Sequence, residues 1–181
     1  PLLGAGGRRP GIMERVFLGL GGNKGDSARI IRAAFGELAG LLTGARMSSL
    51  YRSSARYYED QPDFVNAAVE GLTDLDPEAL LAAVNGIEAR YGRDRSKEIV
   101  KGPRSLDIDI LLYGERLIVE PNLVIPHAGL RERKFALLPL LELDAGLMDP
   151  ASGRPFASIL ASLPPQGIYL LETADYDRLY I

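Results

Sequence analysis

The alternation of apolar and polar residues along the chain predicts four β-strands. Short, β-prone segments bounded by glycine, proline or polar residues predict strands at residues 16–20, 46–52, 64–71 and 106–112. Side chains two residues apart in a strand point to the same face of a sheet. The third strand should therefore turn Val65, Ala67 and Val69 to one face, and Phe64, Asn66 and Ala68 to the other. The last strand should place Leu106, Ile108, Ile110 and Leu112 on one face.

Two further segments carry apolar residues at helical spacing and start at residues that cap helices. Asp26 precedes the first helix, and Asp76 precedes the second, where Pro77 occupies the first helical position. The buried stripe of the first helix is predicted to be Ile31, Ala34, Phe35, Leu38 and Leu42. The stripe of the second is predicted to be Leu80, Val84, Ile87 and Tyr91.

The resulting order, β-α-β-β-α-β, predicts a ferredoxin-like α+β sandwich with an antiparallel sheet. Both helices should cover one face, which leaves the other face for ligands. From residue 114 onward we expect an extension with a hairpin, one or two short helices and a late strand near residues 168–171. Residues 1–13 are expected to form a disordered leader, and residues 14–181 a single domain.

Composition narrows the class of protein. The net charge of −3 argues against a protein that coats nucleic acid, and the absence of cysteine excludes disulfides and thiolate metal sites. No apolar run reaches the ~20 residues of a membrane helix, and the first residues lack the apolar core of a secretory signal. We therefore expect a cytoplasmic monomer that binds neither nucleic acid nor membrane.

Asp107 and Asp109 are the sharpest chemical signal. They lie two residues apart in the last predicted strand, so both carboxylates face away from the apolar side that Ile108 and Ile110 define. Like charges this close repel unless a cation neutralises them, and Mg²⁺ prefers oxygen ligands. Two such acids can hold a magnesium site for phosphoryl transfer. The alternative is a solvated strand face.

Basic residues lie on both sides of this pair and suit a triphosphate. They are Arg93, Arg95, Lys97, Lys101 and Arg104 upstream, and Arg131, Arg133 and Lys134 downstream. A solvated basic loop is the alternative. The chain has no G-x-x-x-x-G-K-[ST] motif, and residues 19–22 are a weak candidate for a phosphate-binding turn. His127, the only histidine, could contact a phosphate or the adenosine group.

Two further pairs are candidates for ligand contact. Phe64 and Asn66 share the free face of the third strand, where an aromatic ring and an amide suit a flat heterocycle rich in donors and acceptors. Asn85 and Glu88 are neighbours on the surface of the second helix. A half-buried sheet and an ordinary helix flank would explain the same residues without a ligand.

Several of these stretches together resemble the 6-hydroxymethyl-7,8-dihydropterin pyrophosphokinase family. The resemblance rests on residues 19–23 (GLGGN), 49–52 (SLYR), 60–68 (DQPDFVNAA), 102–111 (GPRSLDIDIL) and 125–127 (IPH), followed by Arg133 and Phe135. These motifs run in family order from about residue 15 to 145. The GPR-x-LDID block followed by Pro-His is the most specific part.

The resemblance implies a ferredoxin-like fold, two Mg²⁺ ions, ATP as donor and a hydroxymethyl pterin as acceptor, with AMP and the pterin diphosphate as products. It implies Asp107 and Asp109 as metal ligands, and a catalytic set of Asp107, Asp109, Arg95 and Arg104. The implied ATP contacts are Asn85, Glu88, Arg95, Lys101, Arg104, Ile108, His127, Arg131 and Arg133. The implied pterin contacts are Asn23, Ser53, Ser54, Arg56, Phe64, Asn66 and Phe135.

The chain departs from the family pattern at loop positions. Gly22, Phe64 and Lys101 stand where family members often have Ser, Tyr and Trp, so individual loop contacts are in question. The polar segments 53–61 and 93–101 are expected to act as lids that order around the substrates. Three alternatives remain: an RNA-binding ferredoxin-like module, a two-metal nucleotidyltransferase, and a homologue that binds without catalysing.

Overall fold

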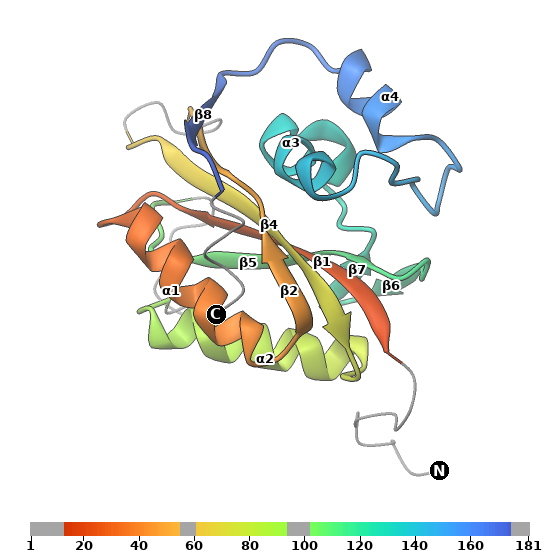
Figure 1. Ribbon diagram of the computed structural model, residues 1–181, viewed down its shortest axis with the longest axis horizontal. Helices are drawn as coiled ribbons and strands as arrows, with labels where there is room; N and C mark the ends of the chain where they lie inside the picture. Colours follow the sequence, from red (N-terminus) through yellow and green to blue (C-terminus); the bar gives the residue numbers. More distant parts are fainter. Residues whose placement is uncertain (1–12, 55–60, 94–101, 175–181) are drawn as a thin grey trace.

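The computed structural model describes residues 13–54, 61–93 and 102–174 (Figure 1). The expected leader therefore lies outside the described residues, apart from Met13. The strands are β1 (Glu14–Gly22), β2 (Thr43–Met47), β3 (Leu50–Ser53), β4 (Phe64–Thr73), β5 (Asp107–Tyr113), β6 (Ile118–Glu120), β7 (Leu123–Ile125) and β8 (Ile168–Glu172). The helices are α1 (Ser27–Ala39), α2 (Pro77–Arg90), the 3-10 turn η1 (Leu130–Glu132), α3 (Lys134–Leu143) and α4 (Phe156–Ser162).

The main sheet is antiparallel and follows the predicted β-α-β-β-α-β order, except that two strands, β2 and β3, replace the second predicted strand. Its strands lie in the order β5-β1-β4-β3-β8, and β2 also pairs with β4. This arrangement confirms the α+β fold class. The extension contains the expected hairpin (β6 and β7), the helices α3 and α4 and the late strand β8, which adds to the sheet beside β3. Within the described residues, no helix has the length and apolar character that crossing a membrane requires.

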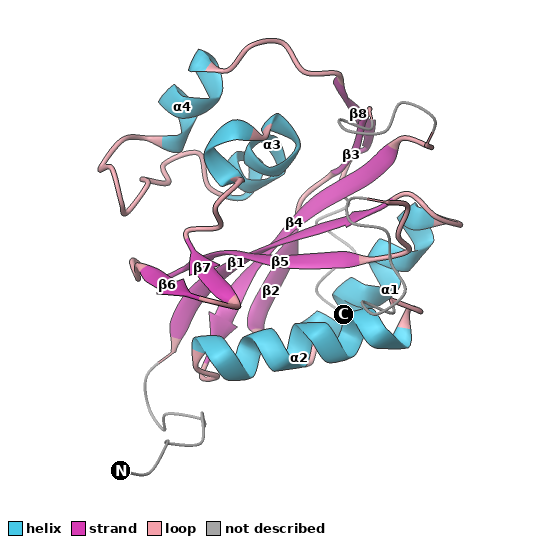
Figure 2. Ribbon diagram, turned by 180° about the vertical axis from the view of Figure 1, so that it is seen from behind, coloured by secondary structure: helices cyan, strands magenta, loops and turns pink. Residues whose placement is uncertain are grey.

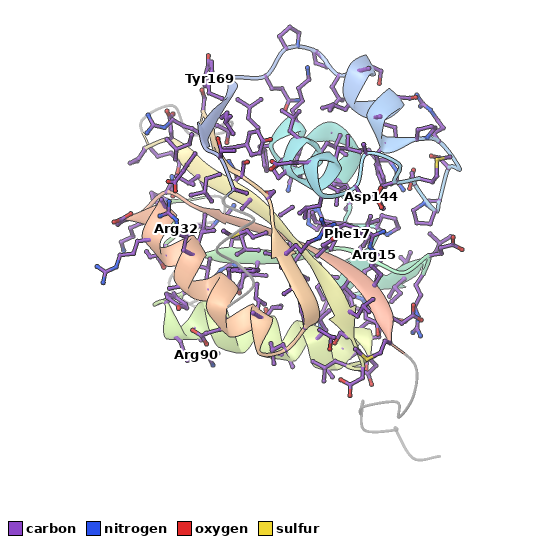
Figure 3. The ribbon with its side chains drawn as sticks, in the orientation of Figure 1. Arg15, Phe17, Arg32, Arg90, Asp144 and Tyr169 are labelled. Atoms are coloured by element: carbon purple, nitrogen blue, oxygen red, sulfur yellow. The ribbon has the colours of Figure 1, made fainter. Side chains whose placement is uncertain are left out.

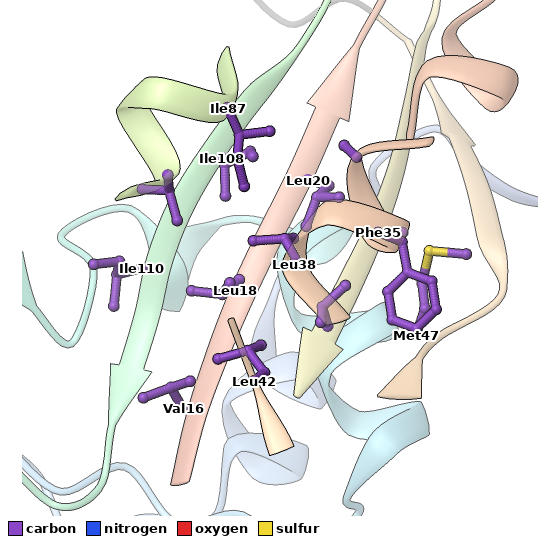
Figure 4. Close-up of a cluster of buried hydrophobic side chains, with 14 of the residues drawn as sticks. Val16, Leu18, Leu20, Phe35, Leu38, Leu42, Met47, Ile87, Ile108 and Ile110 are labelled. Carbon is purple, nitrogen blue, oxygen red and sulfur yellow. The ribbon is translucent and has the colours of Figure 1, made fainter. Parts of the chain in front are cut away.

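Helices α1 and α2 cover one face of the sheet, as their apolar stripes predict (Figure 1). The side chains of Asp26 and Asp76 accept hydrogen bonds from the N–H groups of Arg29 and Ala79, so both predicted caps are confirmed. The core between the helices and the sheet contains the predicted stripe residues, including Leu42, which lies beyond the end of α1 (Figure 4).

The opposite face is only partly free, in contrast to the expectation. Helix α3 packs against it, and α4 packs on α3 (Figure 2). Side chains of both helices form a second core with Phe17, Leu111 and Leu112. Arg15 reinforces this layer. Its guanidinium lies 4.7 Å from the centre of the Phe17 ring and 2.7 Å from the Asp144 carboxylate at the end of α3 (Figure 3). The uncovered part of this face is where the candidate site lies.

The predicted strand at residues 46–52 is wrong as a single element, because it breaks into β2 and β3 at Ser48 and Ser49. The Ser48 hydroxyl accepts the Ala68 N–H at 2.9 Å, and the Ser48 N–H donates to the Ala68 carbonyl at 2.9 Å. A side chain thus takes a hydrogen bond that would otherwise go to the strand ladder.

The predicted alternation of the last strand also fails at its end. Ile110 of β5 pairs with Leu18 of β1, whereas Leu112 pairs with Phe17, so Leu111 is an extra residue in the ladder. Such a bulge shifts the following side chains to the other face. Leu106, Ile108 and Ile110 lie in the core under α1 and α2 as predicted, but Leu112 lies in the second core.

Candidate active site

A pocket opens where β1, β4 and β5 meet the start of α3. It is lined by Gly19, Leu20, Gly21, Ser53, Ser54, Gln61, Phe64, Asn66, Ala67, Arg104, Asp107, Asp109, Leu111, His127, Arg133, Phe135 and Ala136. Part of its floor is β1 backbone, because Gly19 and Gly21 alternate on the pocket face. A side chain at Gly21 would begin 3.4 Å from Asn66 Oδ1, and would therefore fill the floor.

The predicted acid pair faces this pocket from β5. Asp107 is paired with Arg93 and, at 3.1 Å, with Nε of Arg104. Asp109 Oδ2 lies 3.9 Å from Nε2 of His127. Burial and the neighbouring Asp107 carboxylate raise the pKa of Asp109 to about 7. The pocket therefore holds one acid that is paired with arginines and one whose ionised form is disfavoured in the absence of a cation.

Glu88 on α2 lies behind the acid pair. Its side chain is 1% exposed. Its carboxylate accepts the Ile108 N–H at 2.7 Å and pairs with Arg93, which in turn pairs with Asp107. Neither Glu88 nor Ile108 lines the pocket, and the Ile108 side chain lies in the core. Glu88 and the Ile108 side chain thus lie on the core side of β5, away from the pocket, where Glu88 supports the strand that carries the acids.

Arg104 lines the pocket and is paired with the acid pair through Asp107. Although its Nε is 3.1 Å from Asp107 Oδ2, this buried nitrogen has no aligned hydrogen-bond acceptor among the described residues. The guanidinium also lies over the Phe64 ring, 5.6 Å from its centre. A buried donor without an acceptor costs free energy. Arg104 is therefore prepared for an anionic ligand in the pocket.

Asn23 does not line the pocket, although the resemblance implied a pterin contact. It is buried, and its amide donates to Gln61 Oε1 and the Pro62 carbonyl at 3.1 and 3.0 Å. Its own carbonyl Oδ1 accepts the Arg104 N–H at 3.0 Å. Asn23 thus joins the segment before β4 to the segment before β5. It holds Gln61 and Arg104, which both line the pocket.

The far side of the pocket is aromatic and hydroxyl-bearing. Phe64 and Phe135 line it, together with Ser53 and Ser54 at the end of β3. Asn66 donates from Nδ2 to Ser53 Oγ at 2.9 Å, which fixes the amide in the pocket wall. Aromatic rings beside fixed polar groups suit a planar heterocycle. The prediction that Phe64 and Asn66 share one face of the strand is confirmed, and this face lines the pocket.

His127 enters the pocket beside Asp109. Its Nδ1 accepts the Gly129 N–H at 3.2 Å, so the neutral ring carries its proton on Nε2. Burial and the nearby Arg133 lower the pKa of His127. His127 is therefore a neutral ring that can donate a hydrogen bond from Nε2. This suits contact with a phosphate oxygen better than it suits the role of a general base.

Arg131 and Arg133 are two residues apart but have different roles. Arg133 lines the pocket. Arg131 instead donates from Nε and a terminal nitrogen to the Asp149 carboxylate at 2.7 and 2.8 Å. This bidentate pair holds Arg131 outside the pocket lining, so the structure does not support the implied ATP contact.

Ten of the implied site residues meet in the pocket. They are Ser53, Ser54, Phe64, Asn66, Arg104, Asp107, Asp109, His127, Arg133 and Phe135. Asn85, half-buried on α2, does not line it. Arg56, Arg95 and Lys101, and most of both expected lids, lie outside the described residues.

The sequence reasoning missed Gly19, Leu20, Gly21, Gln61, Ala67, Leu111 and Ala136 as lining residues. The alternating glycines of β1 were a readable signal, because they leave one strand face open to a ligand. They lie in a strand, so the weak alternative of a phosphate-binding turn at residues 19–22 is wrong.

The donor set of the pocket fits magnesium. In the part of the chain that the structure describes, no group of three or more acidic, histidine or cysteine side chains could hold a metal ion. Magnesium needs only one or two carboxylates when substrate phosphates complete its shell. Asp107 and Asp109 are oxygen ligands of this kind, and burial and the Asp107 carboxylate raise the pKa of Asp109 to about 7 despite the nearby Arg133 and Arg104.

Comparison with known proteins assigns the chain to a family. Residues 17–145 match the family model "7,8-dihydro-6-hydroxymethylpterin-pyrophosphokinase (HPPK)". The 2-amino-4-hydroxy-6-hydroxymethyldihydropteridine pyrophosphokinase of Methylorubrum extorquens is 40% identical over 88% of this chain and 100% of its own length. The enzyme of that name from Pseudomonas aeruginosa is 38% identical over 90% of this chain and 100% of its own length.

Other relatives are longer proteins. The folic acid synthesis protein fol1 of Schizosaccharomyces pombe is 39% identical over 91% of this chain, which spans only 22% of that protein. The solved HPPK-DHPS of Plasmodium falciparum has the same fold, with a TM-score of 0.66 and 15% identity over 83% of this chain and 44% of that one. The chain therefore belongs to the 7,8-dihydro-6-hydroxymethylpterin-pyrophosphokinase family.

Proposed function

We propose that this protein transfers pyrophosphate from Mg-ATP to the hydroxymethyl group of 6-hydroxymethyl-7,8-dihydropterin in folate biosynthesis. The products are AMP and the pterin diphosphate. The observation that carries the proposal is the composition of a single pocket. It combines a pair of strand-borne acids, the cations Arg104 and Arg133, and an aromatic slot formed by Phe64 and Phe135.

The aromatic side of the pocket suits the pterin. Phe64 and Phe135 offer ring faces to a flat bicyclic heterocycle, and Asn66 and Ser53 offer an amide and a hydroxyl to its edge. This slot lies beside the acid pair, so a hydroxymethyl group on the bound ring reaches the charged side. The pterin hydroxyl is the attacking group, and the β-phosphorus of ATP is the electrophile.

The charged side suits the triphosphate. Arg104 and Arg133 supply positive charge, and His127 offers its Nε2 proton to a phosphate oxygen. Asp107 and Asp109 hold Mg²⁺, in our proposal two ions, which neutralise charge on the phosphate oxygens when bound. The protein forms no covalent bond to substrate. Positioning of the hydroxyl and neutralisation of charge supply the rate.

The proposal also includes three further cationic residues, the oligomeric state and the compartment. Arg56, Arg95 and Lys101 are proposed to add cationic contacts from segments outside the described residues, as the family resemblance implies. We further propose that the protein works as a monomer in the cytoplasm. Measurement of molar mass by light scattering during size-exclusion chromatography tests whether the protein is a monomer.

Incubation with Mg-ATP and 6-hydroxymethyl-7,8-dihydropterin tests the activity. We expect one AMP and one pterin diphosphate per turnover, and no AMP when the pterin is omitted. Release of pyrophosphate instead of AMP would identify a nucleotidyltransferase. Absence of either product, with ATP binding retained, would identify a homologue that binds without catalysing. Retention of RNA on a filter at low salt would favour the nucleic-acid module.

A further inference from the structure

Arg133 reaches the pocket from the short connection between η1 and α3. Its backbone is extended, with φ −121° and ψ 103°, and α3 begins at the next residue. An arginine side chain loses much conformational freedom when it is held in one geometry. A cation that must meet a phosphate group in a defined position therefore benefits from groups that fix it in advance.

Gln166 fixes the backbone on both sides of Arg133. Its Oε1 accepts the Lys134 N–H at 3.0 Å, and its Nε2 donates to the Glu132 carbonyl at 2.9 Å. The first N–H groups of a helix lack partners inside the helix, and α3 has no side-chain cap of its own at Arg133. Gln166, in the segment between α4 and β8, supplies this cap from 32 residues away.

Gly129 fixes the side chain of Arg133. A Cβ atom at Gly129 would lie 2.5 Å from both Cζ and Nε of Arg133, and 2.9 Å from Nη1. The guanidinium therefore packs directly on the Gly129 backbone. The backbone of Gly129 has φ −88° and ψ 0°, which any residue can adopt, so conformation does not require glycine here. A side chain at Gly129 would instead displace the Arg133 guanidinium from its position.

We propose that Gly129 and Gln166 are positioning residues, which together seat the Arg133 guanidinium in the pocket for contact with the phosphate groups of ATP. The inference deepens the proposed function and rests on it. Gly129 contributes the surface under the guanidinium, and Gln166 fixes the direction in which the side chain leaves the backbone. The segment between α4 and β8 thereby acts on the ATP side of the site.

The test measures kcat and the KM for ATP in Gly129→Ala, Gln166→Ala and Arg133→Ala, and in each positioning variant combined with Arg133→Ala. Loss of one charged hydrogen bond should raise the KM for ATP about tenfold in Arg133→Ala. Each positioning variant should show part of that increase. In the Arg133→Ala background, neither should add a further increase, because the group that they seat is already absent.

Gln166→Glu gives a graded comparison. It retains an acceptor for the Lys134 N–H but loses the donor to the Glu132 carbonyl. Its KM for ATP should therefore lie between those of the wild type and Gln166→Ala. Thermal unfolding identifies any variant that does not fold. The folded variants then show whether Gly129 and Gln166 position Arg133.

Two outcomes would contradict the proposed positioning of Arg133. One is a wild-type KM for ATP in both Gly129→Ala and Gln166→Ala. The other is that the effects of these substitutions on the KM for ATP add fully to the effect of Arg133→Ala. Failure of the proposed function is a different result, because the wild type would then form no AMP with the pterin. In that case, the Kd of a fluorescent ATP analogue is measured for the same variants in place of KM. The effects on Kd should show the same non-additivity.

Discussion

Asp107 and Asp109 face the same pocket from β5, but Asp107 is paired with Arg93 and Arg104, whereas Asp109 lies beside neutral His127. The two carboxylates thus differ in their surroundings before any ligand binds. Asp107 has two arginine partners, whereas burial and the Asp107 carboxylate disfavour the ionised form of Asp109 and raise its pKa to about 7. If the acid pair holds Mg²⁺ as proposed, binding of the cation should remove this difference.

Replacement of either acid should remove turnover without unfolding the protein. We expect Asp107→Ala and Asp109→Ala to lower kcat by about 100- to 1,000-fold or more, since a group that neutralises transition-state charge is lost. The Asp109 carboxyl is enclosed by protein except where 40% of its side-chain surface opens to the pocket, so its loss leaves little unfilled space. Glu120→Ala, which removes an exposed acid from β6, is the matched control. Near-normal activity in either site variant, with intact thermal unfolding, would remove the metal assignment.

Binding of Mg-ATP should release a proton from Asp109 at pH 6. The pKa of about 7 means that the carboxyl is protonated at pH 6 in the free protein, and a cation favours its ionised form. Affinity for Mg-ATP should therefore rise with pH through about 7. Calorimetry in buffers of different ionisation enthalpy measures the released proton. Asp109→Asn should abolish the release, and its persistence in that variant would assign the proton to another group.

The same pKa gives the metal-free protein a distinctive pH profile of stability. Between the ordinary pKa of 3.8 and about 7, native Asp109 holds a proton that the unfolded chain has lost. The contribution of this group to the free energy of unfolding is therefore complete at low pH and is lost as pH rises through about 7. Urea unfolding at several pH values, with Asp109→Asn as the comparison, measures this slope. Equal slopes in the two proteins would contradict the assignment.

The strand pattern predicted the acid pair and the aromatic side of the site correctly. Side chains alternate along β4 and β5, so Phe64 and Asn66, and likewise Asp107 and Asp109, had to share a face. The bulge at Leu111 could not be read in the same way. It depends on how β5 aligns with β1, and the residues of β5 alone do not determine that alignment.

The roles of neighbouring basic residues could not be predicted either. Arg131 and Arg133 have the same charge and are two residues apart, yet only Arg133 lines the pocket. The difference arises from Asp149, which lies 18 residues after Arg131 and binds it. In the same way, Gln166 has no local signal of function, because its partners lie before and at the start of α3. Both roles therefore depend on contacts between residues of the extension that are far apart in the sequence.

Loss of the Arg131 guanidinium should destabilise the protein and leave ATP binding unchanged. The hydrogen bonds from Arg131 lower the pKa of buried Asp149 to about 2. The pair therefore stabilises the fold above the ordinary pKa of 3.8, and this stabilisation is lost as pH falls through about 2. At pH 7 we expect Arg131→Ala to lower the free energy of unfolding by about 2 kcal/mol. A raised KM for ATP with unchanged stability would restore Arg131 to the binding site.

Gly22 should be intolerant of a side chain, because the end of β1 touches the segment before β5. A Cβ atom at Gly22 would lie 2.4 Å from the Ser105 carbonyl oxygen, a backbone atom that cannot rotate away. Next to this contact, the Asn23 N–H donates to the Arg104 carbonyl at 2.9 Å. A methyl group here should push Arg104 away from the acid pair, at a cost of about 1–3 kcal/mol in the free energy of unfolding.

Gly22→Ala should therefore lose both stability and activity, as urea unfolding and AMP release will show. Gly36→Ala is the matched control, because no atom lies within 4 Å of its added Cβ and the residue is inside α1. There the same substitution should stabilise the protein by about 0.5–1 kcal/mol, since alanine favours helix more than glycine does. Wild-type kcat and stability in Gly22→Ala would show that the segment carrying Arg104 moves freely away from β1, and that this close approach does not set the position of the guanidinium.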